Sequence, residues 1–189
     1  VGFPEMALQP EEFDAIERTI RARNIRLLVS GIYEPPKEGS PARNYAKIVT
    51  RLTDGPQATG QGRVERPESR WFAAEQHKHH RWFLDERQIR QYGLGAQLAT
   101  SMKWWEYTSL ESRTLQFLAL QPWLALTVLI CEDLARPDPA AEIIRSVGPN
   151  LVIALLQDGP QLASRWPARS ATVLADDPGC SVLTLTSTG

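Results

Sequence analysis

This sequence has few cysteines, almost no net charge and no long apolar run. Each of these absences excludes some classes of protein. The only two cysteines in 189 residues are Cys131 and Cys180, which is too few for a disulfide framework and suits a reducing compartment. The formal net charge is −1, and the basic residues are spread along the chain, so we expect no nucleic acid as the main ligand. No apolar run approaches the about 20 residues of a membrane helix, so we expect no membrane association and a cytoplasmic location.

The remaining composition is that of a globular protein. Hydrophobic residues make up 42% of the chain and charged residues 23%, and the length suits one domain, 1–189, with a sizeable core. Because the sequence opens on Val1 without a methionine and closes directly after a strand pattern, we expect a fragment of a longer protein.

Apolar periodicity predicts strands and helices in alternation. The spacing of Phe13, Ile16 and Ile20 predicts a helix over 10–23, and further helices are expected over 140–147 and 162–176. Short apolar or alternating runs predict strands over 25–32, 45–52, 71–76, 114–120, 124–131 and 151–156, and one more after Pro178-Gly179. Buried strands separated by helices favour an α/β fold. Residues 53–70 are expected to form a long loop, and 81–111 an aromatic-anchored, partly helical surface segment.

The most informative residue is Cys131, which ends the apolar run 124–130 and precedes the acidic pair Glu132-Asp133. A buried strand that delivers a thiol to its C-terminal end places it where open α/β sheets carry their sites. For a lone cysteine, however, a small buried hydrophobe and a nucleophile are equally good interpretations.

Two other segments carry residues of chemical interest. Glu5 follows Phe3-Pro4, which favours an extended backbone, so we place it at a strand end; most such glutamates are merely solvated. Lys78 stands among three histidines, at 77, 79 and 80. These histidines occupy neighbouring strand positions that face opposite sides, and the sequence has no further histidine to complete a ligand set, so we predict no metal site.

Taken together and in this order, three segments resemble the carbon–nitrogen hydrolase (nitrilase) superfamily. They are Phe3-Pro4-Glu5, Lys78-His79-His80 with Glu86 eight residues after the lysine, and Leu129-Ile130-Cys131-Glu132-Asp133. The Cys-Glu-Asp sequence is similar to that of the amidase and glutaminase branches. The resemblance extends over nearly the whole chain and implies a four-layer α-β-β-α sandwich, of which this chain would be a truncated part.

The resemblance also implies roles for single residues. Glu5 would be the general base, Lys78 the cation that stabilises the oxyanion, and Cys131 the nucleophile. Glu86 would be the second glutamate beside the lysine, and the backbone N–H of Glu132 a further oxyanion donor. Such a site requires no metal and no organic cofactor.

The function expected on this basis is that of a cysteine amidohydrolase, which cleaves a non-peptide C–N bond of a small amide through a thioester. Two alternatives stay open. One is a nitrilase-like, non-catalytic or sensing module within a larger, multidomain bacterial protein, with a link to defence. The other is an acyltransferase that uses the same thioester. A small amide is the expected partner, together with homo-oligomerisation and fusion to further domains.

Overall fold

The computed structural model describes residues 1–53, 69–110, 112–157 and 166–187. Within these residues the protein has a mixed α/β fold built on two four-stranded sheets. Most of the expected loop at 53–70, and residues 162–165 of the expected helix at 162–176, lie outside the described residues.

The first sheet has the strand order β1-β2-β3-β4. Its strands are β1 (Gly2–Leu8), β2 (Leu27–Glu34), β3 (Arg43–Thr53) and β4 (Ser69–His77). The first two are parallel, and β2, β3 and β4 are antiparallel neighbours. The prediction that 71–76 pairs with the preceding strand as a hairpin is confirmed, with Tyr45 opposite His77. Lys78 therefore leaves the sheet directly after β4.

The second sheet has the order β10-β9-β8-β7. Its strands are β7 (Leu118–Gln121), β8 (Leu124–Ile130), β9 (Leu151–Leu156) and β10 (Ser181–Thr186). The strands β8, β9 and β10 are parallel, whereas β7 forms an antiparallel hairpin with β8. Because parallel strands end at the same edge of a sheet, Cys131 after β8 and Gln157 after β9 come to lie together.

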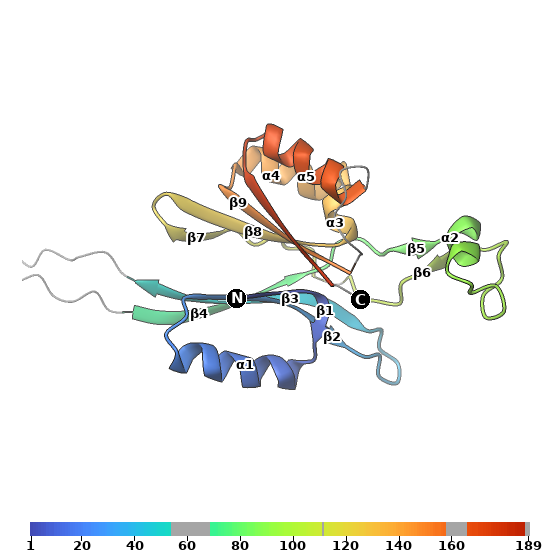
Figure 1. Cartoon of the computed structure of the whole chain (residues 1–189), viewed down its shortest axis with the longest axis horizontal. Coiled ribbons are helices and arrows are strands. Elements are labelled where there is room, and N and C mark those ends of the chain that lie inside the picture. Colours follow the sequence, from blue (N-terminus) through green and yellow to red (C-terminus); the bar gives the residue numbers. More distant parts are fainter. Residues whose placement is uncertain (54–68, 111, 158–165, 188–189) are drawn as a thin grey trace, which may run out of the picture.

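Helices lie on the outer faces of both sheets (Figure 1). The helix α1 (Pro10–Ala22) begins with a proline at its first turn, as expected, and packs Phe13 and Ile20 against β2 and β3. The short helices α3 (Glu132–Ala135), η1 (Pro137–Ala141) and α4 (Glu142–Val147) cover the second sheet together with α5 (Trp166–Asp176). Gly148, at a φ of 66°, ends α4 in the left-handed conformation that glycine adopts most readily.

The core between the two sheets forms from side chains that alternate along each strand. The first sheet contributes Val29, Ala46 and Ile48, and the second sheet contributes Leu126, Val128, Ile130, Ile153 and Leu155. The remaining apolar side chains of the same strands, such as Leu129 and Leu156, face the helices. This two-sided burial explains why 124–130 and 151–156 read as continuous apolar runs.

An excursion of the chain leaves the body between β4 and β7 (Figure 1). It contains β5 (Phe83–Leu84), α2 (Glu86–Gln91) and β6 (Trp104–Trp105). Asp85 caps α2 by accepting the N–H of Gln88 at 2.8 Å. The expected aromatic-rich, partly helical surface segment at 81–111 is thus present over its described residues, 81–110. Among the described residues, no helix is long and apolar enough to cross a membrane.

Candidate active site

Three side chains from distant parts of the chain line one cavity of about 510 Å³. Glu5 belongs to β1, Lys78 directly follows β4, and Cys131 directly follows β8. The other lining residues are Met6, Trp82, Gln88, Tyr92, Glu106, Gln157 and Trp166. The structure therefore brings together the three residues that the sequence singled out.

Glu5 lies within β1 and not at its end, which corrects the position expected from Phe3-Pro4. The register between β1 and β2 shifts between Phe3 and Leu8, and Met6 has a φ of 53°. At this irregularity β1 passes very close to Gly31 of β2, where an added Cβ would lie 2.4 Å from the carbonyl oxygen of Pro4. The irregular strand leaves the Glu5 side chain buried, with its carboxylate in the cavity.

Lys78 is held between two carboxylates. Its Nζ donates to Oε1 of Glu5 at 2.8 Å and to Oε2 of Glu106 at 2.7 Å, and only 2% of its side chain is exposed. Burial lowers the pKa of Lys78, but attraction by Glu5 and then by Glu106 outweighs burial and raises its pKa overall. The lysine is therefore a permanent cation, and one of its three N–H groups remains for a ligand.

Cys131 adopts a backbone conformation that non-glycine residues rarely populate, with φ 45° and ψ −106°. Its N–H donates to the carbonyl oxygen of Leu155 at 2.8 Å, which fixes the turn between β8 and α3. Strain of this kind gathers at functional sites, where it aims a side chain out of a sharp strand-to-helix turn. Here Cys131 lines the cavity together with Glu5, and burial and the Glu5 carboxylate both raise the pKa of the thiol.

The thiol is not a preformed thiolate. Burial raises the pKa of Cys131, and the negative charge of Glu5 raises it further, while Lys78 lowers it by less. A thiol in this state needs a base to remove its proton as it attacks. Glu5, which lines the same cavity, is the neighbouring group able to act as that base.

Glu106 is a site residue that the sequence did not reveal. Its Oε2 accepts from Lys78 and, at 3.1 Å, from the N–H of Trp82, and its Oε1 accepts from Nδ2 of Asn44 at 3.1 Å. It follows Lys78 by 28 residues and the excursion returns it to the lysine. The acidic residue directly after an aromatic pair, Trp104-Trp105, was the available signal, and it is a weak one.

Glu86, which the resemblance placed beside the lysine, does not line this cavity. It stands in the first turn of α2, with 61% of its side chain exposed, and pairs with Arg90 at 2.6 Å. A spacing of eight residues would place Glu86 beside Lys78 only if the chain stayed close to the site, but the chain turns outward after Leu84. The position beside the lysine is filled by Glu106.

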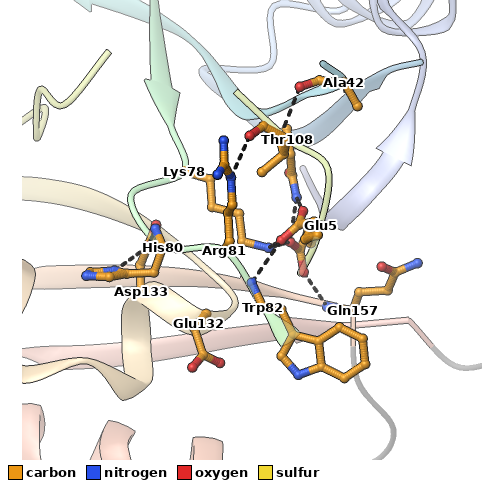
Figure 2. A network of polar contacts seen from close by, with 12 residues as sticks. Glu5, Ala42, Lys78, His80, Arg81, Trp82, Thr108, Glu132, Asp133 and Gln157 are labelled. Carbon is orange, nitrogen blue, oxygen red and sulfur yellow. Dashed lines mark hydrogen bonds and ion pairs between the residues drawn. The ribbon is translucent and has the colours of Figure 1, made fainter. Parts of the chain in front are cut away.

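Asp133 joins the lysine segment to the cysteine turn. Its buried carboxylate accepts the N–H groups of His79 and His80. It also pairs with Nδ1 of His80 at 2.9 Å, and Figure 2 shows these two residues side by side. Lys78 and Cys131 are thereby fixed relative to each other by bonds from their immediate neighbours. The Glu132 side chain pairs with Arg136 at 2.5 Å, while its backbone N–H occupies the first helical position of α3.

The three histidines serve separate contacts. His77 stacks on Tyr45 with ring centroids 5.4 Å apart, His79 is buried beside Gln76, and His80 pairs with Asp133. In the described part of the chain, no group of three or more His, Cys, Asp and Glu side chains is arranged to hold a metal.

Solved structures with a similar fold include an amidase. An amidase from Nesterenkonia sp. is 14% identical, with a TM-score of 0.54, over 98% of this chain and 61% of the amidase. A variant of the amidase from Nesterenkonia sp. AN1, with acrylamide added to its active-site cysteine, gives the same score and identity over 98% and 63%. A glutamine-dependent NAD⁺ synthetase from Acinetobacter baumannii is 13% identical, with a TM-score of 0.48, over 93% of this chain and 28% of the synthetase.

The Nesterenkonia amidase is described as a member of the nitrilase superfamily, so the fold of this chain is similar to that of nitrilase-superfamily amidases. At these identities the likeness concerns the fold alone. The chain spans less than two thirds of the length of these neighbours. No family model matches the chain, and no curated protein matches it.

Proposed function

We propose that this chain carries the active site of a cysteine amidohydrolase that cleaves the C–N bond of a small amide through a thioester. The observation that carries the proposal is the meeting of Glu5, Lys78 and Cys131 in one cavity. The cavity is open to a ligand and not filled by a bulky side chain, which favours catalysis over a purely structural module. The fold neighbours, amidases with an active-site cysteine, support the same chemistry.

The acylation step follows from the hydrogen bonds. The Sγ of Cys131 attacks the amide carbonyl carbon, and its proton passes to the Glu5 carboxylate. The carbonyl oxygen becomes an oxyanion that the free N–H of Lys78 stabilises, with the backbone N–H of Glu132 as the proposed second donor. A donor of this kind typically contributes about 3 to 4 kcal/mol to acyl transfer. Glu5 then returns the proton to the leaving nitrogen, the C–N bond breaks, and an S-acyl enzyme remains.

The second half of the cycle reverses the roles. Water enters the place of the departed amine, Glu5 takes its proton, and the resulting hydroxide attacks the thioester carbonyl. The C–S bond breaks, the acid leaves, and the proton returns to Sγ. Glu106 takes no proton in this scheme: it holds Lys78 in place from the opposite side to Glu5. Neither half of the cycle calls for a metal or an organic cofactor.

We further propose that the two sheets and their helices form the larger part of a four-layer α-β-β-α sandwich. The three separate apolar clusters support this arrangement, since one lies between the sheets and one on each outer face. On this proposal 1–189 is one domain of the carbon–nitrogen hydrolase type.

Ammonia release from a panel of small primary amides tests the proposed activity. Cys131→Ala is expected to abolish release while leaving the far-ultraviolet circular dichroism unchanged, and Cys180→Ala, at the buried second cysteine, is expected to retain it. Ammonia release by Cys131→Ala at the wild-type rate would defeat the proposal. Adding hydroxylamine or a small amine separates the two thioester fates, because an acyltransferase would form the new amide in preference to the acid.

A further inference from the structure

Asn44 of β3 contacts both carboxylates of the site without lining the cavity. Its Nδ2 donates to Oε1 of Glu5 at 2.7 Å and to Oε1 of Glu106 at 3.1 Å, and the residue is 2% exposed. Its backbone oxygen also accepts the N–H of Lys78 at 3.2 Å. One asparagine therefore contacts every charged member of the site.

The two oxygens of Glu5 have different surroundings. Oε1 accepts from both Nζ of Lys78 and Nδ2 of Asn44, so its lone pairs are committed. Oε2 accepts only the N–H of Gln157, at 3.1 Å, in the described structure (Figure 2). Since Glu5 and Cys131 line the same cavity and Oε1 is committed, the oxygen left to receive the thiol proton is Oε2.

The orientation of the asparagine amide is fixed by its partners. Its NH₂ group faces two carboxylates, which accept hydrogen bonds and cannot donate them when ionised. A flipped amide would point its carbonyl oxygen at both negative charges. In the present orientation Oδ1 is buried without a hydrogen-bond partner among the described residues, a cost that the two charge-assisted bonds of Nδ2 offset.

We propose that Asn44 is a positioning residue that holds Oε1 of the Glu5 carboxylate and thereby turns Oε2 toward Cys131. The inference rests on the proposed function, because it assigns the base in the proposed acylation step. Asparagine is disfavoured in strands, and its place in the middle of a sheet, beside the buried lysine, is explained by this contact. The charged or titratable groups that face Glu5 are Lys78, Glu106 and Cys131, and Asn44 contacts two of them.

Alkylation of Cys131 by iodoacetamide tests the inference without a known substrate. The S–C bond forms, iodide leaves, and the thiol proton passes to Glu5, so the rate reports the base directly. Rates are measured from pH 4 to pH 10 by peptide mass spectrometry, with Cys180, which is 3% exposed, as the internal reference. The variants are Asn44→Leu, Asn44→Ser and Asn44→Asp, and the matched control is Asn150→Leu at the opposite end of β9.

Loss of a donor to an ionised carboxylate favours its protonation. We therefore expect Asn44→Leu to move the acid limb of the profile about one pH unit upward, so that alkylation slows about tenfold at any pH on that limb and little on the plateau. Asn44→Ser, which keeps a donor, should shift the limb less. Asn44→Asp adds a third negative charge and should shift it most. The Asn150→Leu profile should match that of the wild type.

Two outcomes would overturn the inference. One is an acid limb that stays at the wild-type pH in both Asn44→Leu and Asn44→Asp. The other is an equal loss of rate at every pH, which a structural role alone would produce. If Asn44→Leu does not fold, the comparison of Asn44→Ser with Asn44→Asp decides, and the inference requires the larger shift of the acid limb in Asn44→Asp. Alkylation does not depend on turnover of an amide. Unshifted pH profiles of alkylation in Asn44 variants that still hydrolyse amides therefore refute this inference alone. Ammonia release by Cys131→Ala instead refutes the proposed function.

Discussion

At the scale of the residue, the site consists of a thiol that is hard to ionise next to a carboxylate that can take its proton. The pKa of Cys131 is raised by burial and by the charge of Glu5, so the thiol enters catalysis as S–H. Lys78 has its pKa raised by the same carboxylate and by Glu106. The resting site therefore keeps the proton on sulfur, so the proposed reaction needs a general base beside the thiol.

The raised pKa of Cys131 also predicts how stability depends on pH. An unfolded cysteine ionises near pH 8.5, whereas the folded thiol stays protonated above that pH. The contribution of this group to folding is thus complete below about pH 8.5 and falls as the pH rises, by up to about 1 kcal/mol per pH unit. Urea unfolding at pH 7.5 and pH 9.5 checks this.

In that experiment Cys131→Ala should lose less stability than the wild type between the two pH values. Cys180→Ala provides a control cysteine, since burial raises the pKa of Cys180 as well but no charge of the site contacts it. A loss of stability that is identical in the wild type and Cys131→Ala would contradict the assignment of a protonated thiol.

Glu106 and Glu86 form a matched pair of carboxylates, one in the site and one outside it. Glu106→Gln removes a charge that holds Lys78, so we expect the rate of amide hydrolysis to fall at least about tenfold. Glu86→Gln breaks only an exposed pair with Arg90, so the rate should stay within about twofold and the stability within about 0.5 kcal/mol. Steady-state kinetics of both variants measure the two rates. A larger loss of rate in Glu86→Gln than in Glu106→Gln would favour Glu86 as the second glutamate beside the lysine.

Sequence patterns predicted the residues whose signal is local. Cys131 ends a long apolar run and Lys78 follows an alternating strand, so both could be placed at strand ends. Glu106 and Asn44 could not be found in this way, because their roles arise only when the excursion folds back and β3 joins the same sheet as β1. Glu5 was identified by its neighbours, but its position inside an irregular strand depends on a contact with Gly31 that no local pattern encodes.

At the scale of the element, the irregular strand β1 sets the position of the base. Gly31 on β2 leaves room for the β1 backbone from Pro4 to Met6, whose atoms lie within 2.4 to 2.6 Å of an added Cβ. The neighbouring strand must therefore move if residue 31 gains a side chain. Since backbone cannot rotate away as a flexible side chain can, the displacement is passed on to Glu5.

We accordingly expect Gly31→Ala to lose about 1 to 3 kcal/mol of stability and to slow amide hydrolysis by about 10²-fold, because a shift of about 1 Å at a catalytic group has that effect. The control is Gly95→Ala, where the nearest atom to an added Cβ is Cγ2 of Thr100 at 3.9 Å. Thermal unfolding and kinetics are measured on both. Wild-type activity in Gly31→Ala would show that the β1 geometry does not set the base.

At the scale of the whole molecule, the two sheets hold together a site whose parts are far apart in sequence. The bond between Glu5 and Lys78 spans 73 residues, and the bond between Glu5 and Gln157 spans 152. The core between the sheets, with Ile48 on one side and Ile130 on the other, fixes the edges at which these residues emerge. The fold could be anticipated as α/β from its apolar runs, but those runs also allow a single continuous sheet, and two sheets were expected only from the resemblance.

Trapping an S-acyl group on Cys131 tests the central claim most directly. The protein is incubated with a panel of small amides, quenched in acid and mapped by peptide mass spectrometry, with Cys131→Ala and Glu5→Gln as comparisons. We predict an acyl adduct on Cys131 of the wild type, its absence from Cys180, and strongly reduced acylation in Glu5→Gln. Ammonia release without any adduct on Cys131, or with acylation undiminished in Glu5→Gln, would contradict the account.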